Sequence, residues 1–251
     1  MEAEQELEVL EHFHLNSLVD IRLGWFDISI TNLVVWMFVG AALFLLIFYL
    51  LVIRPKLYPS KRQTVAEMLV EFLKRNMIYN MMGKKNGEKW FPFVSAVFIF
   101  ILSNNLVGII PGAYTPTSNP IVPLTLALIV FFTVQIANLR SGGIRGYART
   151  FAPRAVPSWM YVLVTPIEIV SAIAKPFSLF IRLTVNMLAG HTIIFVILGL
   201  IIYFKNYLIA IAAVPFAVVM TILEIVVSAI QAYIFGILTA MYIGEAVNPK
   251  H

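Results

Sequence analysis

The sequence has 251 residues, of which 60% are hydrophobic and only 12% are charged. A soluble domain carries about 25% charged residues, so this composition predicts a membrane protein with several spans. Cysteine is absent, which excludes disulfides, thiol catalysis and cysteine-based metal sites. The net charge of +5 does not indicate nucleic-acid binding, because 13 of the 18 basic residues fall into two clusters, residues 54–89 and 140–154. Basic clusters beside apolar segments are a signal of membrane topology.

Residues 1–29 form an acidic N-terminal segment that holds seven of the 13 acidic residues. His12 and His14 offer too few ligands for a metal site, so we expect a solvated tail and no metal. The segment lacks the basic region of a signal peptide, so the first apolar helix should be its own insertion signal. Residues 30–251 are predicted to form a single membrane domain.

The first half of this domain is predicted to contain three membrane helices and one surface helix. Residues 30–53 carry no charge over a length that crosses a bilayer. Residues 63–82 are apolar but carry charges at helical spacing, which predicts an amphipathic helix on the cytoplasmic surface. Membrane helices follow at 90–110 and 121–139, joined by an uncharged loop that we expect to be external.

The second half holds two apolar segments, 159–204 and 207–246, separated only by Lys205 and Asn206. A helix of 40 residues is about 60 Å long, roughly twice the thickness of the hydrocarbon layer. Each segment is therefore either two crossings with a hidden turn or one strongly tilted helix. Neither segment contains a convincing turn, although its prolines can kink it. We therefore favour two long tilted helices that form a hairpin.

A polar stripe runs along the first of these long helices and is centred on Arg182. At 100° per residue, five polar residues lie within about 40° of it: Glu168, Ser171, Lys175, Ser178 and Asn186. A charge at bilayer depth costs about 3 kcal/mol on insertion scales. The nearest acid on the stripe is Glu168, about 21 Å away by helix rise. Arg182 therefore has no neutralising partner on its own helix.

The second long helix repeats the pattern with Glu224, Ser228, Gln231, Phe235 and Tyr242 on one face. Facing residues of an antiparallel hairpin have position numbers with a nearly constant sum. Arg182 with Gln231 gives 413 and His191 with Glu224 gives 415, and both values place the fold-back near residue 207. On an ideal helix, however, His191 lies about 180° from Arg182. It needs local twisting, or it faces a different side of the second helix.

A buried His191–Glu224 pair is a candidate proton relay, because histidine exchanges its proton near neutral pH and a buried carboxyl group can do the same. The alternative is an ion pair that only fixes the register of the two helices. We favour the relay.

The residues that carry these features resemble one known family. The run KPFSLFIRLTVNMLAGH (175–191), Glu224 and the run IQAYIF (230–235) are similar to subunit a of the F-type ATP synthase. The resemblance extends to SNNL (103–106), PG (111–112) and PTSNP (116–120), and covers residues 30–246. One departure is Leu183-Thr184-Val185, where the family usually has a small third residue.

The resemblance implies an all-α polytopic membrane protein whose last two helices form a long tilted hairpin against a ring of c subunits. Arg182 would face the ring carboxylate, with Asn186 and Gln231 beside it. His191 and Glu224 would be the exchangeable pair of the outer half-channel, with Asn105 on the same path and Glu168 near the cytoplasmic exit. Ser178 and Tyr242, on the two polar stripes, complete the predicted proton path.

The resemblance further implies a subunit that is not itself an enzyme, without a cofactor. Its partners would be the c-ring, the b subunits of the peripheral stalk, membrane lipid and the transported H⁺, in the inner or plasma membrane of a cell or the inner membrane of a mitochondrion. A sodium-translocating version of the subunit is one alternative. An unrelated secondary transporter is another, although the internal repeats typical of that class are not evident.

Overall fold

The computed structural model describes residues 17–19, 22–23, 26–27, 29–53, 58, 60–110, 113, 115–151, 160–204 and 207–248. The first 16 residues, with His12 and His14, lie outside this part of the chain. So do Pro111-Gly112, Trp159 and the Lys205-Asn206 break.

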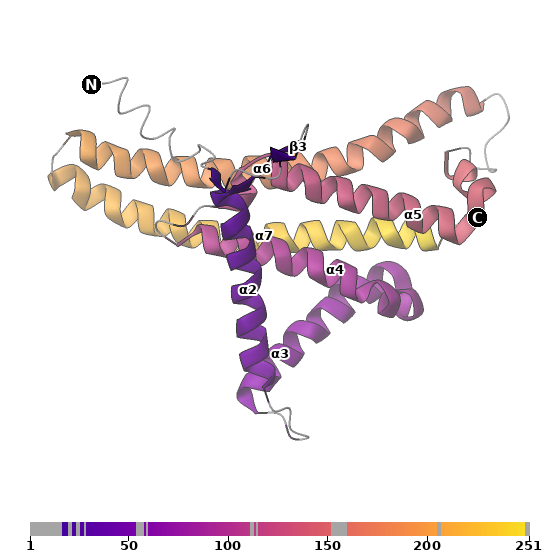
Figure 1. Ribbon diagram of the computed structural model, residues 1–251, viewed down its shortest axis with the longest axis horizontal. Helices are drawn as coiled ribbons and strands as arrows, with labels where there is room; N and C mark the ends of the chain where they lie inside the picture. Colours follow the sequence, from indigo (N-terminus) through magenta and orange to yellow (C-terminus); the bar gives the residue numbers. More distant parts are fainter. Residues whose placement is uncertain are drawn as a thin grey trace. The chain divides into compact units, whose positions relative to one another are not determined.

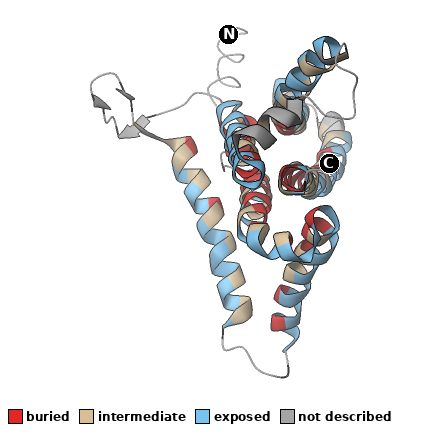
Figure 2. Ribbon diagram, turned by 90° about the vertical axis from the view of Figure 1, so that its right-hand side faces the viewer, coloured by how far each residue is buried: buried red, intermediate tan, exposed pale blue. Residues whose placement is uncertain are grey.

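Two short antiparallel ladders precede the first helix. Strand β1 (Ser17–Val19) pairs with β4 (Ile30–Thr31), and β2 (Arg22–Leu23) pairs with β3 (Phe26–Asp27). Sequence reasoning expected a tail without strands here. Helix α2 (Asn32–Val52) follows, and most of its large apolar side chains are exposed, as a lipid-facing helix requires. Figure 2 shows how burial varies along the ribbons.

The next part of the chain is helical from Lys61 to Gly108, with local changes in geometry. Helix α3 (Lys61–Phe72) is capped by the Ser60 side chain, which accepts a hydrogen bond from the Gln63 amide. It continues as a π-helical stretch, η1 (Leu73–Tyr79), and as α4 (Asn80–Gly108). Gly83 breaks the helix with a φ of 74°, a conformation that favours glycine. The predicted surface helix 63–82 thus covers α3, η1 and the first residues of α4.

A short 3₁₀ turn, η2 (Pro116–Ser118), leads into α5 (Ile121–Phe151). All three residues of η2 are buried within the protein, and the external position of the loop that contains them stays a prediction. Helix α5 extends beyond the predicted end at residue 139 and is interrupted at Gly143, where φ is 62°.

The last two helices are α6 (Tyr161–Phe204, 44 residues) and α7 (Tyr207–Val247, 41 residues). Each is one continuous helix that passes through its prolines, Pro166 and Pro176 in α6 and Pro215 in α7, as the unbroken ribbons in Figure 1 show. This settles the choice between one long helix and two crossings for each segment. In the described part of the chain, five helices are long and apolar enough to span a membrane. The protein is an all-α polytopic membrane protein.

The chain folds into two compact units, and the long helices contribute to both. The first unit comprises Met1–Phe44, Phe100–Val122 and Leu183–Gln231. In it the end of α4 packs closely on α2: a Cβ on Gly40 would lie 3.2 Å from the side-chain oxygen of Asn104. Asn104 and Asn105 are fully buried on this part of α4.

The second unit comprises Leu45–Ile99, Pro123–Arg182 and Ala232–His251. Its core is built where η1 and α4 meet the end of α7, and Met77, Ile78, Phe235 and Ile243 are fully buried there. Two glycines of α7 allow the close approach. A Cβ on Gly244 would lie 2.6 Å from the backbone oxygen of Met81. Hydrogen bonds from Ser141 to the Ala246 carbonyl oxygen (2.6 Å) and from Asn248 to that of Met82 (3.1 Å) close this end of the unit.

Candidate functional site

His191 of α6 and Glu224 of α7 lie against each other in the first unit. His191 Nε2 is 3.4 Å from Glu224 Oε1, and the two side chains are only 12% and 6% exposed. The contact inferred from the sum of the position numbers is therefore present. The Glu224 carboxyl group lies against both Gly190 and His191, which places α7 on the side of α6 between these two residues. This side differs from the one that carries Arg182, which removes the need for local twisting.

The carboxyl group of Glu224 is buried without a good hydrogen bond. Neither of its oxygens has a hydrogen-bond partner among the described residues, and the contact with His191 is longer than a usual hydrogen bond. Three more buried polar atoms on these helices share this property: Asn186 Nδ2, Ser228 Oγ and Gln231 Nε2. Buried polar atoms are normally paired with protein or with water. This row of polar atoms therefore has the chemistry of a hydrated path.

A pocket of about 150 Å³ opens beside the pair, lined by Asn186, Gly190, Met220 and Glu224 among others. This volume is sufficient for several water molecules. At Gly190 the two helices approach closely, because a Cβ added there would lie only 3.0 Å from Glu224 Oε1. A glycine at this position lets the carboxyl group lie directly against α6.

The end of α4 and the η2 turn bring further polar groups to this unit. Asn105 is fully buried, and its side-chain oxygen accepts a hydrogen bond of 2.7 Å from the hydroxyl group of Thr117. The hydroxyl oxygen of Thr115 lies 2.6 Å from His191 Nε2. Thr115 and His191 are thus directly linked, and Thr117 holds Asn105 in the same unit.

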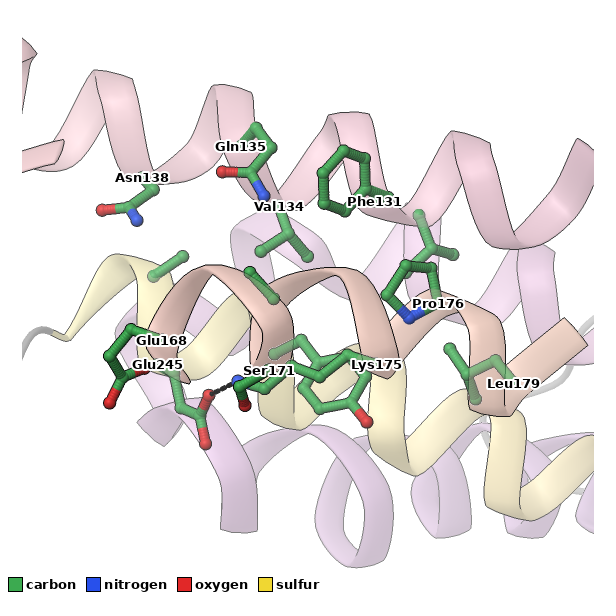
Figure 3. A pocket seen from close by; sticks show the side chains of 14 residues that line it. Phe131, Val134, Gln135, Asn138, Glu168, Ser171, Lys175, Pro176, Leu179 and Glu245 are labelled. Carbon is green, nitrogen blue, oxygen red and sulfur yellow. Dashed lines mark hydrogen bonds and ion pairs between the residues drawn. The ribbon is translucent and has the colours of Figure 1, made fainter. Parts of the chain in front are cut away.

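The second unit contains a separate polar pocket of about 110 Å³, shown in Figure 3. Lys175 of α6 forms an ion pair of 2.8 Å with Glu245 of α7, and its ammonium group also lies 4.9 Å from the ring centre of Tyr242. Gln135 and Asn138 of α5 line the same pocket, as does Glu168 of α6. A lysine flanked by a carboxylate and an aromatic ring is held at a defined position.

Arg182 is exposed on α6, and the described part of the chain provides neither a hydrogen bond nor an ion pair for its guanidinium group. It is the last α6 residue of the second unit, whereas Gln231 is the last α7 residue of the first. The proposed pairing of Arg182 with Gln231 therefore stays a prediction. A charge on an apolar membrane helix is costly unless it is paired.

The family model for the ATP synthase A chain matches residues 34–244. The chain belongs to the ATP synthase A chain family. Three curated proteins called ATP synthase subunit a are similar over nearly the full length. The one from Mesorhizobium japonicum is 35% identical over 254 residues, which cover 99% of this chain and all of the relative.

The subunit a of Magnetococcus marinus is 38% identical over 98% of this chain and 95% of its own length. That of Hyphomonas neptunium is 38% identical over 96% of both chains. The chain is thus a multi-pass membrane component of the ATP synthase, as its resemblance to subunit a predicted.

The A chain's predicted site residues divide between the two units. In the first unit, Glu224 and Asn186 line one pocket, His191 contacts Glu224, and Asn105 and Gln231 are buried. In the second unit, Glu168 and Tyr242 line the other pocket. Ser178 is exposed and lines neither pocket.

Sequence reasoning missed several polar residues near these sites. Thr115 and Thr117 lie in a short turn, where periodicity gives no signal. Gln135 and Asn138 are isolated polar residues of a helix that was interpreted only as a membrane span. Glu245 could have been found, because Lys175 was already on the polar stripe and the position numbers of the two sum to 420, close to the other predicted pairs.

Proposed function

We propose that this chain is the proton-translocating subunit a of the stator of an F-type ATP synthase. It forms two half-channels against a ring of c subunits and couples proton flow to rotation of the ring. It is a non-catalytic subunit. Its other partners are the b subunits of the peripheral stalk and the membrane lipid. It resides in an energy-converting membrane, which is the inner or plasma membrane of a cell or the inner membrane of a mitochondrion.

The observation that carries this proposal is the buried His191–Glu224 contact, in a member of the A chain family. Both groups can hold or release a proton, and they lie 3.4 Å apart with a pocket beside them. Buried polar atoms of Asn105, Asn186 and Gln231 supply hydrogen-bonding groups for water on either side of the pair. We assign this set to the half-channel through which protons reach the ring.

The second polar pocket supports a separate path. Glu168 and Tyr242 line it, with Gln135 and Asn138 on the facing helix. We assign it to the half-channel through which protons leave, and we include Ser178 between this pocket and Arg182 on the α6 sequence. Rotation of the ring requires two proton paths that do not join, because a continuous path would let protons cross the membrane without turning the ring.

Arg182 is proposed to separate these two paths. Arginine stays protonated even where it is desolvated, whereas a buried lysine can lose its proton. A permanent positive charge requires the ring carboxylate that passes it to be ionised, so that this carboxylate releases its proton into one path and takes up the next from the other. The exposure of Arg182 and the lack of a partner for it among the described residues are consistent with a partner on the ring.

The proposal is tested by passive proton conduction through the membrane sector, assembled with its ring and reconstituted into vesicles. Glu224→Gln replaces the carboxyl group by an amide of the same shape, and we expect conduction to fall by a factor of about 10². Glu71→Gln is the matched control, because Glu71 is an exposed acid in an i,i+4 pair with Arg75. Unchanged conduction in assembled Glu224→Gln would show that the pair only fixes helix register.

A further inference from the structure

Thr115 contacts the proposed relay from outside the two long helices. Its hydroxyl oxygen lies 2.6 Å from His191 Nε2, which is the same nitrogen that lies 3.4 Å from Glu224 Oε1. Thr115 is 5% exposed, so this hydrogen bond is formed away from bulk solvent. One ring nitrogen therefore has two oxygen neighbours, one on the turn before α5 and one on α7.

The local structure fixes Thr115 in this position. Its carbonyl oxygen accepts hydrogen bonds from both the hydroxyl group (2.8 Å) and the backbone amide (3.2 Å) of Ser118, which closes the η2 turn behind it. Thr117 of the same turn is tied to Asn105 of α4. Gly108 of α4 leaves the space that the Thr115 side chain occupies, because a Cβ added at Gly108 would overlap it. Three independent contacts thus hold the hydroxyl group beside His191.

A single ring nitrogen cannot serve both neighbours at the same time. When Nε2 carries a hydrogen, it can donate it to the Thr115 oxygen or transfer the proton to the Glu224 carboxylate. When Nε2 has no hydrogen, its lone pair can accept a hydrogen bond from the Thr115 hydroxyl group. Thr115 can act in both states because a hydroxyl group is donor and acceptor, and rotation about one bond exchanges the two roles.

We propose that Thr115 is a positioning residue of the proton path, which holds His191 Nε2 before and after each proton exchange with Glu224. In the forward step the proton leaves Nε2, binds to Oε1 of Glu224 and neutralises the carboxylate, while the imidazolium becomes neutral imidazole. The Thr115 hydroxyl group then rotates and donates its hydrogen bond to the bare Nε2. Thr115 keeps its own proton throughout.

This role explains why the His191–Glu224 contact is longer than a good hydrogen bond. Thr115 holds the shorter contact, so the imidazole ring is kept from closing fully onto the carboxylate. A permanently closed ion pair would hold the proton too firmly for rapid exchange. The inference rests on the proposed function, since it assigns a further residue to the same half-channel.

The test compares Thr115→Val, which removes the hydroxyl group at nearly constant shape, with Thr115→Ser, which keeps it. Loss of one positioning hydrogen bond predicts roughly fivefold to tenfold slower passive proton conduction in the valine variant. The serine variant should conduct almost as the parent does. Thr192→Val is the matched control, because the hydroxyl group of Thr192, next to His191, only bonds to the Leu188 carbonyl oxygen of its own helix.

A double-variant cycle distinguishes positioning from a merely structural role. In a His191→Leu background, Thr115→Val should cause little further loss, because the nitrogen that it positions is absent; independent structural effects would instead be additive. If the valine variant does not assemble with the ring, Thr115→Ala provides the same comparison. Parental conduction in the variant without the hydroxyl group, or additive losses in the cycle, would overturn the inference.

The same series separates this inference from the function on which it rests. Slow conduction in Glu224→Gln together with parental conduction in Thr115→Val would remove only the role of Thr115. Parental conduction in assembled Glu224→Gln would remove the proposed half-channel itself.

Discussion

Gly190 offers a test in which proton conduction should fall without a loss of stability. It lies on α6 beside Glu224, and a Cβ added there would be 3.0 Å from Oε1, 3.3 Å from Cδ and 3.6 Å from Cγ of that side chain. A contact of 3.0 Å is tighter than ordinary van der Waals contact. In Gly190→Ala the carboxyl group must therefore move by a few tenths of an ångström.

That displacement lengthens a contact on which proton exchange depends. Glu224 Oε1 starts 3.4 Å from His191 Nε2, so movement away from α6 by a few tenths of an ångström should open the gap to about 3.7 Å. A misplacement of 1 Å can reduce a rate by a factor of about 10², so a few tenths of an ångström predict a reduction of roughly threefold to tenfold. The stability of α6 should not decrease, because alanine is favoured over glycine in a helix by about 1 kcal/mol.

The assay is the initial rate of passive proton uptake by vesicles that contain the reconstituted membrane sector, normalised to the amount of assembled chain and ring. Gly199→Ala is the matched control, since it makes the same change on the same helix at a position where an added Cβ meets nothing within 4 Å. We expect normal assembly in both variants and slow uptake only in Gly190→Ala. Equal uptake in the two assembled variants would refute the reasoning that the Glu224–His191 distance limits conduction.

The remaining predictions concern the packing of α7 in the second unit. Gly244→Ala should lower stability by about 1–3 kcal/mol, because the added Cβ would lie 2.6 Å from the Met81 backbone oxygen, which cannot move without shifting α4. Gly236→Ala should be milder, since the nearest atoms are the flexible end of Met77, with Sδ at 2.9 Å and Cε at 3.1 Å. The temperature at which half of the assembled complex is lost measures the stability of both variants. A loss of stability in Gly236→Ala that equals or exceeds the loss in Gly244→Ala would contradict the argument.

The composition and the length of the apolar segments were enough to predict the membrane helices, because the bilayer imposes their length and their lack of charge. The one-helix interpretation of 159–204 and 207–246 was confirmed, since both helices continue through their prolines. Strands β1 to β4 were not predicted, because two or three residues are too few for a period of two to be recognised.

The His191–Glu224 contact was predictable because position numbers in an antiparallel pair of helices have a nearly constant sum. The angular objection to it came from treating the Arg182 stripe as the only interhelical face of α6. In the first unit, Leu183, Thr184 and Met187 of α6 are buried, so α6 has a packed side there that differs from the Arg182 stripe. A long helix can therefore present different faces to different neighbours along its length.

The contact between Thr115 and His191 could not be predicted from the sequence. It depends on a buried turn between two helices, and the side-chain direction in such a turn follows from tertiary packing, not from periodicity. The uncharged composition of residues 111–120 is compatible with a solvent-exposed turn and with a buried one. The burial of Thr115, Pro116 and Thr117 distinguishes the two.

The central claim is that Arg182 separates two proton paths and thereby couples proton flow to the ring. ATP-driven proton pumping by the assembled complex carrying Arg182→Lys tests this most directly, with Arg75→Lys, at an exposed i,i+4 pair, as the matched control. We predict that Arg182→Lys abolishes pumping although the complex assembles, because a desolvated lysine can lose the charge that the mechanism requires. Robust coupled pumping by the Arg182→Lys complex would contradict the account.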